Sequence, residues 1–217
     1  MKKVVILLFL VIFAVAAVAE ITRKVTATHY YEGNPKKEMT FYDNSGKEAA
    51  KEFYHIDGRV MGVKGSIPDG EVNEYYLNGK IKSSAYYKAN LLQEEKEFYS
   101  SGVQKSHTVN SWSGRNLIDS TYIMFYSNGK KQQAMKMDSN GDGTSDLYYE
   151  TGELFEKAKL KDAYRDGPVT QYYKNGKIML SGFMKDDFLN GPAKEYDSDG
   201  TLIKETIYRE GEEVAQK

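Results

Sequence analysis

The sequence predicts an all-β protein: an elongated, single-layer, twisted antiparallel sheet built from repeated β-hairpins. Three observations lead to this fold class. Tyrosine, which favours strands, is abundant, with 18 tyrosines against one tryptophan and four prolines. Beyond the N-terminal leader, no segment shows the apolar spacing of an amphipathic helix. A short glycine–tyrosine unit recurs along most of the remaining chain.

The N-terminus predicts a secretory signal peptide, residues 1–19. Two lysines precede an unbroken apolar run, Val4 to Ala19, which ends in small residues. The run is shorter than the roughly 20 residues that span a bilayer as a helix, and a polar segment follows from Glu20. We therefore expect an exported product that is periplasmic, cell-surface or secreted, with no integral membrane segment after cleavage.

The charge balance and the lack of cysteine limit the chemistry that the chain can support. Its 30 Lys and Arg against 31 Asp and Glu give a formal net charge of −1, whereas a nucleic-acid partner needs a clustered basic face. The absence of cysteine excludes disulfides, thiolate nucleophiles, cysteine metal sites and lipid attachment at the cleavage point. Packing and backbone pairing alone must hold the fold together.

The repeat has a regular spacing. In its clearest copies, a glycine is followed by tyrosine at plus five and by a second glycine at plus nine. From Gly79 onward, the steps between second glycines are 23, 27, 23, 24 and 24 residues. We expect a lead-in strand over residues 20–38 and an array of about seven to eight hairpin units over residues 39–217. The clearest copies are Gly70–Gly79, Gly143–Gly152, Gly167–Gly176 and Gly191–Gly200.

The residues before the second glycine predict the hairpin turns. Asn-Gly dipeptides such as Asn175-Gly176 tolerate positive φ at both centres of a two-residue turn. With this dipeptide as the loop, Tyr173 should face Ile178 and Tyr172 should face Met179. Each such pair contributes about 0.2–1 kcal/mol, so the hairpins must stack to be stable. The equivalent pairs are Tyr76 with Ile81 and Tyr149 with Leu154.

The pattern Gly-x-x-x-x-Tyr-Tyr-x-Asn-Gly-Lys-Ile resembles the MORN repeat in its bacterial variant form, over about residues 39–211. The resemblance implies a MORN-like repeat array in which each unit contacts its neighbours. Proteins with this variant often carry a YwqK-like antitoxin label, which suits an exported chain poorly because a cytosolic toxin would be out of its reach. We expect residues 106–118, which include Trp112, to be irregular and to carry a longer loop between repeats.

One stretch offers oxygen ligands for a cation. Oxygen-bearing side chains alternate from Asp138 to Asp146 with glycine at the sixth position, as in the first part of a calcium loop. The glutamate that completes such a loop is missing, because Tyr149 stands at its position. In the other interpretation, Gly143 is the first glycine of a repeat, preceded by turn-forming residues. The candidate calcium ligands are Asp138, Asn140, Asp142, Thr144 and Asp146.

The sequence predicts no enzyme and no cofactor apart from the possible calcium. No Gly-x-Ser-x-Gly motif occurs, and the three histidines lie in dissimilar contexts: His29, His55 and His107. We expect the acidic pairs Glu94-Glu95 and Asp186-Asp187 to be solvated rather than to act in acid–base catalysis. The lysines beside the turns are expected to protect strand edges from aggregation, namely Lys80, Lys130 and Lys177.

Two classes of function stay open. We favour a non-catalytic protein-interaction scaffold or envelope-associated adhesion protein, because a repeat array creates an extended surface. The alternative is a module that binds envelope glycans or lipid headgroups, since tyrosine pairs such as Tyr172-Tyr173 could form a platform for sugar rings. If the rings instead pack within the sheet, the platform is lost.

Overall fold

The structure is a computed structural model that describes residues 21–27, 37–43, 45–54 and 60–214. These residues form strands joined by turns and contain no helix, so the predicted all-β fold class is confirmed. No helix that is long and apolar enough to cross a membrane occurs among them. The predicted signal peptide, residues 1–19, lies outside the described residues.

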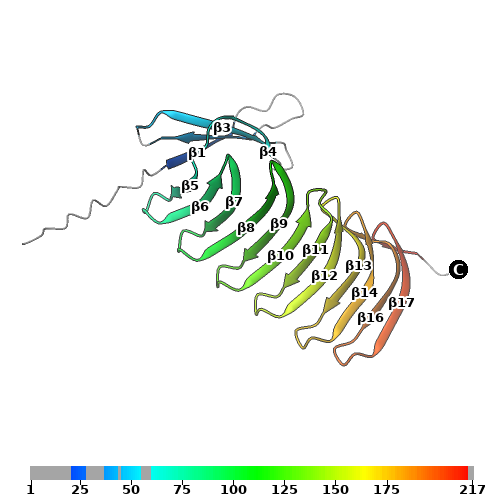
Figure 1. The fold of residues 1–217 in the computed structure, drawn as a ribbon. Helices are drawn as coiled ribbons and strands as arrows, with labels where there is room; N and C mark the ends of the chain where they lie inside the picture. Colours follow the sequence, from blue (N-terminus) through cyan, green and yellow to red (C-terminus); the bar gives the residue numbers. More distant parts are fainter. Residues whose placement is uncertain (1–20, 28–36, 44, 55–59, 215–217) are drawn as a thin grey trace, which may run out of the picture.

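The described residues form one sheet of eighteen strands, which runs the length of the molecule (Figure 1). From β5 to β15 each strand pairs antiparallel with the next, β14 also pairs with β16, and β16, β17 and β18 continue the antiparallel order. Strands β1 to β4 form a separate antiparallel meander, which a parallel pairing between β1 and β5 joins to the array. The strands are β1 (Ile21–Ala27), β2 (Lys37–Tyr42), β3 (Glu48–Tyr54), β4 (Val60–Gly65), β5 (Gly70–Tyr75), β6 (Ile81–Lys88), β7 (Leu91–Phe98), β8 (Gln104–Ser113), β9 (Asn116–Phe125), β10 (Lys131–Asp138), β11 (Gly143–Tyr148), β12 (Leu154–Lys161), β13 (Tyr164–Tyr172), β14 (Ile178–Lys185), β15 (Phe188–Leu189), β16 (Gly191–Tyr196), β17 (Leu202–Arg209) and β18 (Glu212–Glu213).

The array has two faces of different character. Successive side chains of a strand point to opposite sides, and the registers carry each side chain to the same side as its cross-strand partner. One side, which we call the inner face, carries the buried residues of each strand, including Val72, Ala85, Ala158 and Val169. The other side, the outer face, carries exposed lysines together with exposed apolar residues such as Phe183. The inner face is therefore the side on which a core can form.

The β1–β4 meander supplies the core of the N-terminal half. It folds over the inner face of the first array strands, where Phe41 and Tyr87 are fully buried and meet edge-to-face with their ring centroids 5.2 Å apart. Figure 1 shows the meander crossing the end of the array beside β5 and β6. The sequence predicted units that touch only their neighbours. The first unit has no preceding neighbour, and the meander buries its inner face instead.

The C-terminal half has a thinner core. Its buried cluster contains Ala158, Val169 and Met184, with Leu180 and Leu189 packed against them. No second layer covers this cluster in the described part of the chain. The strands lie close together here, as shown by Gly182, at which an added Cβ would lie only 3.0 Å from the Ala193 Cβ. Small side chains and close strand packing therefore replace a covering layer.

The glycine-tipped turns contain three loop residues, so the predicted two-residue turns and the cross-strand pairs beside them are wrong. Tyr172 pairs with Ile178 next to a bulge, whereas beyond the bulge the strands keep the predicted register, as in the pair of Gln171 with Leu180. In the equivalent turn, the Tyr76 N–H donates to the Lys80 carbonyl over 2.8 Å, and Gly79 has a φ of 78°. This is a type I turn followed by a glycine bulge. Asn78 stays in the right-handed region because its Oδ1 accepts the Lys80 N–H, at 3.1 Å.

Two-residue turns with positive φ at both centres occur at the opposite end of the strands. They contain no Asn-Gly dipeptide, so their type could not be recognised from that signal. We call this edge of the array the short-turn rim and the edge with the glycine-tipped turns the Tyr rim. The two-residue turns are Ala89-Asn90, Asp162-Ala163, Asp186-Asp187 and Glu210-Gly211.

Tyrosines tie the turns of the Tyr rim together. The tyrosine that begins each turn donates its hydroxyl to the carbonyl of the residue just before the next turn, over 2.6 to 2.8 Å. These rings therefore bridge successive hairpins. The second tyrosine of a predicted sugar-binding pair, such as Tyr173, thus bonds the next hairpin and does not form part of a platform. The bonds run from Tyr76 to Phe98, Tyr99 to Phe125, Tyr126 to Tyr148, Tyr149 to Tyr172, and Tyr173 to Tyr196.

Every second turn adds two further bonds. In the Asn-Gly-Lys turns, the asparagine amide and the lysine ammonium also donate to carbonyls of the next turn, as when Lys130 donates to Thr151 over 2.7 Å. The predicted role of these lysines as protectors of strand edges is therefore replaced by a bridging role. The donors are Asn78 and Lys80, Asn128 and Lys130, and Asn175 and Lys177.

Residues 106–118 carry no long loop. They belong to β8 and β9, the two longest strands, which are joined by a tight turn at Gly114 and Arg115. A register shift between Ser111 and Trp112 is the only irregularity in their pairing. The missing repeat glycines misled the prediction, because longer strands rather than an insertion account for the wider spacing here.

Candidate functional site

A cleft of about 1250 Å³ lies between the β1–β4 meander and the inner face of the array. One wall is β4, including Val60, Met61 and Val63. The floor comes from inner-face residues of β7 to β10, and residues of the short-turn rim form its mouth. The cleft exists because the meander folds over β5–β7 and stops before it covers the following strands.

The floor of the cleft combines an apolar patch with polar side chains. Trp112, the only tryptophan of the chain, lies there with Leu92, Leu117 and Met137. The indole N–H donates to the Leu92 carbonyl over 2.9 Å, at the point where a bulge shifts the register of β6 and β7. This bond orients the ring, so its apolar surface belongs to the cleft wall. A binding surface of this kind favours apolar or aromatic groups on a ligand.

A buried carboxylate stands where the cleft meets the N-terminal core. Glu52 is 2% exposed, and its Oε2 accepts hydrogen bonds from the hydroxyls of Tyr54 and Tyr87. Burial raises the pKa of Tyr54 well above its usual value, and the neighbouring charge of Glu52 raises it further. Both tyrosines therefore act as hydroxyl donors, and the bond from Tyr87 anchors β6 to β3 across the core.

Two ion pairs line the end of the cleft near the Tyr rim. The Lys82 ammonium lies 3.2 Å from a Glu74 oxygen, and the Lys105 ammonium lies 3.3 Å from a Glu97 oxygen. Serine hydroxyls support both carboxylates, from Ser83 at 3.3 Å and Ser106 at 3.1 Å. The charge of Glu97 raises the pKa of Lys105, and the hydrogen bond between them adds to this effect. These groups are ordered by their partners, because each carboxylate is engaged by both a lysine and a serine.

The candidate calcium ligands fall into a turn and the strand that follows it. The Asp138 Oδ1 accepts the N–H groups of Asn140 and Asp142, at 2.8 and 3.0 Å. An Asp142 oxygen accepts the Asp162 N–H of the neighbouring turn, at 3.1 Å. These two carboxylates are thus engaged with the backbone. Aspartates hold two further turns of the same form, at Asp43 and Asp197.

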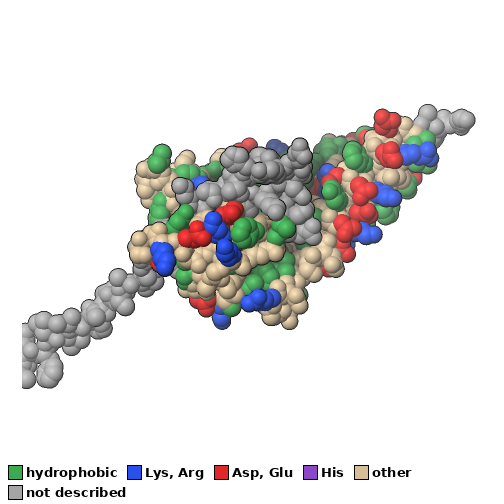
Figure 2. Space-filling model, turned by 90° about the horizontal axis from the view of Figure 1, so that it is seen from above, with side chains coloured by type: hydrophobic (Ala, Val, Ile, Leu, Met, Phe, Trp, Pro, Cys, Tyr) green, Lys and Arg blue, Asp and Glu red, His purple; other side chains and the backbone are tan. Residues whose placement is uncertain are grey.

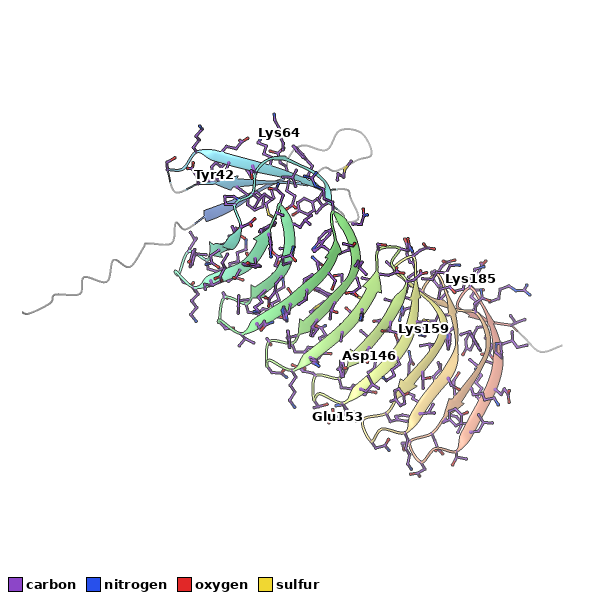
Figure 3. All side chains as sticks on the ribbon, in the orientation of Figure 1. Tyr42, Lys64, Asp146, Glu153, Lys159 and Lys185 are labelled. Carbon is purple, nitrogen blue, oxygen red and sulfur yellow. The ribbon has the colours of Figure 1, made fainter. Side chains whose placement is uncertain are left out.

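The remaining candidate ligands lie further along the chain. Thr144 and Asp146 are on the outer face of β11, part-way along the strand (Figure 3), and an Asp146 oxygen lies 3.6 Å from the Lys157 ammonium. The described residues contain no group of three or more His, Asp or Glu side chains that could hold a metal. The calcium site stays a prediction, and it would need backbone carbonyls, Asn140 or Thr144 to complete its ligands.

Other candidates from the sequence have separate places. His107 bonds Glu94 on the outer face, at 2.8 Å, while His29 and His55 lie outside the described residues. Asp187 sits in a turn of the short-turn rim, where its Oδ1 accepts from the Arg165 guanidinium over 2.9 Å. Glu95, predicted as a solvated charge, lines the cleft. Strand alternation alone would have separated it from Glu94, because neighbours in a strand face opposite sides.

The fold and the cleft define a class of protein: a single-layer β-repeat protein that carries a binding cleft beside a folded-over N-terminal meander. The family described as MORN repeat variant matches residues 68–89, 165–186 and 189–210. Each matched segment is a single hairpin with its turn on the Tyr rim. The chain contains MORN-variant repeats at these three segments, and the repeat resemblance found in its sequence is confirmed.

Two further comparisons add little. No curated protein matches the chain. The crystal structure of a protein with unknown function from Bacteroides fragilis is similar over 86% of this chain and 91% of that chain, at 12% sequence identity and a TM-score of 0.14. This TM-score is too low to support a shared fold.

Proposed function

We propose that the protein is an exported, non-catalytic binding protein that holds a segment of a partner protein in the cleft between β4 and the inner face. The observation that carries this proposal is the cleft itself, which is large and has an apolar patch around Trp112 on its floor. Repeat arrays of this kind commonly present binding surfaces. The carboxylates that Ser83 and Ser106 contact in the cleft are already paired with lysines, and the one described histidine, His107, bonds Glu94 on the outer face, which supports binding rather than catalysis.

Export is part of the proposal and rests on the predicted signal peptide. Removal of residues 1–19 would leave a chain that begins at Glu20. Intact-mass analysis of the protein recovered from outside the cytoplasm tests this directly. A mass that includes the first 19 residues in the cytoplasmic fraction would refute export and leave the binding proposal to be tested there.

A protein partner suits the surface better than nucleic acid does. Figure 2 shows acidic and basic side chains interspersed over the C-terminal part of the visible face, without a field of one sign. The cleft lining likewise mixes four carboxylates with three cationic side chains. Mixed charges around an apolar floor are typical of surfaces that bind polypeptides.

An envelope glycan is the second candidate. Trp112 and Asn110 line the same cleft, and an aromatic ring beside an amide is a common arrangement for sugar binding. The indole face would stack on a sugar ring. A glycan array probed with the exported chain separates this candidate from a protein ligand. Liposome pelleting on the same material tests lipid headgroups.

Site-specific photo-crosslinking in the native host tests the location. A photoreactive residue at Met61, which is 59% exposed in the cleft, is compared with one at Ile203, which is 61% exposed at the far end of the array. We expect a discrete protein adduct from position 61 and none from position 203. Equal labelling at both positions, or none at position 61 together with a glycan-array signal, would overturn the proposal of a protein ligand in the cleft.

A further inference from the structure

We infer that the cleft binds its ligand as an added β-strand: an extended segment of another protein that pairs with the edge of β4 and lays alternate side chains on the Trp112 floor. This inference rests on the proposed function and specifies how the same site would recognise its ligand. It follows from the state of the β4 edge, the position of the floor and the charge of the lining.

Strand β4 has a free edge in the described part of the chain. The one residue register that β4 forms with a described strand is with β3. The Ser66 N–H donates to the Ala49 carbonyl over 3.3 Å, which sets the phase of the antiparallel ladder. Hydrogen-bonded and non-bonded pairs alternate along such a ladder, so Gly62 and Lys64 point their backbone groups at β3. The N–H and carbonyl of Val63 therefore point outward from the sheet.

The β4 edge lacks the usual protection of exposed edges. Its first four residues, Val60 to Val63, contain no charge, and Val60 and Met61 are 48% and 59% exposed. A Cβ added at Gly62 would meet nothing within 4 Å. The one charged residue, Lys64, lies on the side of the meander away from the array (Figure 3). Natural proteins rarely leave an apolar edge of this kind unpaired.

The opposite edge of the sheet shows what protection looks like. Strand β18 turns back along β17 and covers part of its free side. The Lys204 ammonium bonds Glu213 over 2.6 Å, which places a charged pair beside the edge. The two ends of the sheet therefore differ, because a short return strand blocks one and an open cleft adjoins the other.

The floor lies where a strand added to β4 would place its side chains. Val60 to Val63 line the same cleft as Trp112, Leu117 and Met137. Alternate side chains of an extended peptide point to one side, so every second residue would contact this floor. Main-chain bonds give such complexes affinity, and the side chains on the floor give them specificity. The peptide would carry apolar or aromatic groups at alternate positions.

The charge of the lining further defines the ligand. Its four carboxylates exceed its three cationic side chains, and two of these cations, Lys82 and Lys105, already pair with Glu74 and Glu97. An acidic peptide would meet like charge here. We therefore infer a neutral or basic extended segment.

The test uses peptides selected from a random library on the whole exported chain. Binding is followed by the fluorescence of Trp112, which reports on the cleft because the chain has no other tryptophan. Each selected peptide is then made in two forms, N-methylated at odd or at even positions. We expect one form to lose about tenfold or more in affinity and the other to bind nearly as well as the parent, because only alternate amides pair with an edge strand.

A pair of protein variants provides the matching test from the other side. Val63→Pro removes the outward N–H, while Val63→Ala shortens the side chain and keeps the N–H. Circular dichroism is used to check that both variants are folded. Edge strands tolerate proline where the N–H faces away from the neighbouring strand. We expect about a tenfold weaker binding for the proline variant than for the alanine variant.

The outcomes separate the two proposals. Selected peptides that change Trp112 fluorescence but bind equally in both methylated forms would overturn strand addition and leave the cleft as a protein-binding site. Peptides that bind without changing this fluorescence, or a failure to select any peptide, would overturn the proposed function as well. Concentration-dependent dimerisation that Val63→Pro abolishes would identify a second copy as the occupant and overturn the inferred partner.

Discussion

The N-terminal and C-terminal halves of the array protect their inner faces in different ways. In the first half, a folded-over meander buries large aromatic residues such as Phe41 and Tyr87. In the second half, a small cluster around Val169 is buried within a single layer. Hydrogen bonds between successive turns run along both halves.

The difference shows how a repeat array can acquire a site. A single layer gains stability from neighbour contacts alone and offers only shallow surfaces. Folding four strands over one end creates a second layer, and a cleft appears where that layer stops. The functional surface therefore lies at the boundary between the covered and uncovered halves, near Trp112.

The largest test of this comparison is core truncation in the covered half. Phe41→Ala should lower the free energy of unfolding by about 3–5 kcal/mol, because it leaves a cavity against Tyr87. Val169→Ala in the uncovered half should cost less, about 2 kcal/mol. Urea unfolding with residue-resolved hydrogen exchange measures both. Equal losses spread over the whole array would contradict two separately protected halves.

The covered half should also be sensitive to alkaline pH. Burial raises the pKa of Tyr54, so the folded protein keeps this proton at pH values where the unfolded chain loses it. Stability is fully present below the ordinary tyrosine pKa of 10.0 and falls above it, by about 1.4 kcal/mol per pH unit. Tyr54→Phe should flatten this slope, while Tyr164→Phe, at an exposed site, serves as the control. Identical slopes in both variants would contradict the assignment to Tyr54.

A bound calcium would stabilise the uncovered half and reduce the difference in stability between the two halves. At a hundredfold excess over its dissociation constant, it would add about 2.7 kcal/mol. We expect no such shift, because Asp138 and Asp142 already accept backbone N–H groups. Asp138→Ala should cost about 1 kcal/mol with or without calcium. A calcium-dependent rise in melting temperature that Asp142→Ala abolishes would establish the predicted site.

The tyrosine bridges make a smaller contribution per residue. Tyr173→Phe removes one hydroxyl bond to the Tyr196 carbonyl and should cost about 1 kcal/mol. Tyr164→Phe is the control, because Tyr164 lies beside the short-turn rim and is 54% exposed. Thermal unfolding of the two variants compares them. No loss in Tyr173→Phe would mean that the ring, and not its bridging bond, carries the stabilisation.

The smallest expected effect is a gain. The turn from Tyr99 to Val103 lacks the asparagine and lysine of its neighbours. The Val103 Cγ1 would lie 3.9 Å from a Cβ added at Gly129, just as the Lys80 Nζ would lie 3.9 Å from a Cβ added at Gly102. Position 103 therefore corresponds to position 80 in its own turn. Replacing Ser101 by Asn and Val103 by Lys should add two bonds to the next turn and about 0.5–1 kcal/mol. Unchanged stability would mean that the bridging bonds only replace hydration.

The hairpin array could be predicted from the sequence because its information is local. Glycine–tyrosine spacing marks each hairpin, and alternation assigns the faces. The turn length was missed because Asn-Gly suits both two-residue and three-residue loops. The first residue of the turn differs between repeats. Tyrosine at that position bonds the next hairpin, whereas Asp43, Asp138 and Asp197 cap their own turns. An aspartate there can be recognised in the sequence as a turn that is held by its own first residue.

The cleft could not be predicted, because it depends on contacts between distant segments. No repeat spacing in β1–β4 indicates that Phe41 will reach Tyr87, 46 positions further along the sequence. Trp112 was assigned to a loop of unknown role, and Glu95 to solvent, because their surroundings come from another layer. Local patterns predict on which face of the sheet a side chain lies. Only the complete fold shows which segment packs against that face.

The alternation of turn types has a mechanical consequence. Within a pair of turns, three side chains of one turn reach the next, as from Tyr126, Asn128 and Lys130. Between pairs, a single tyrosine hydroxyl makes the connection, as from Tyr149, whose ring also lies 5.4 Å from the Lys174 ammonium. The strand ladders add to these bonds, with eight residue pairs between β8 and β9, where one hydroxyl joins the turns, and five between β10 and β11, where three side chains join them. The extra turn bonds therefore reinforce a shorter ladder, which evens out the resistance of this part of the sheet to a stretching force.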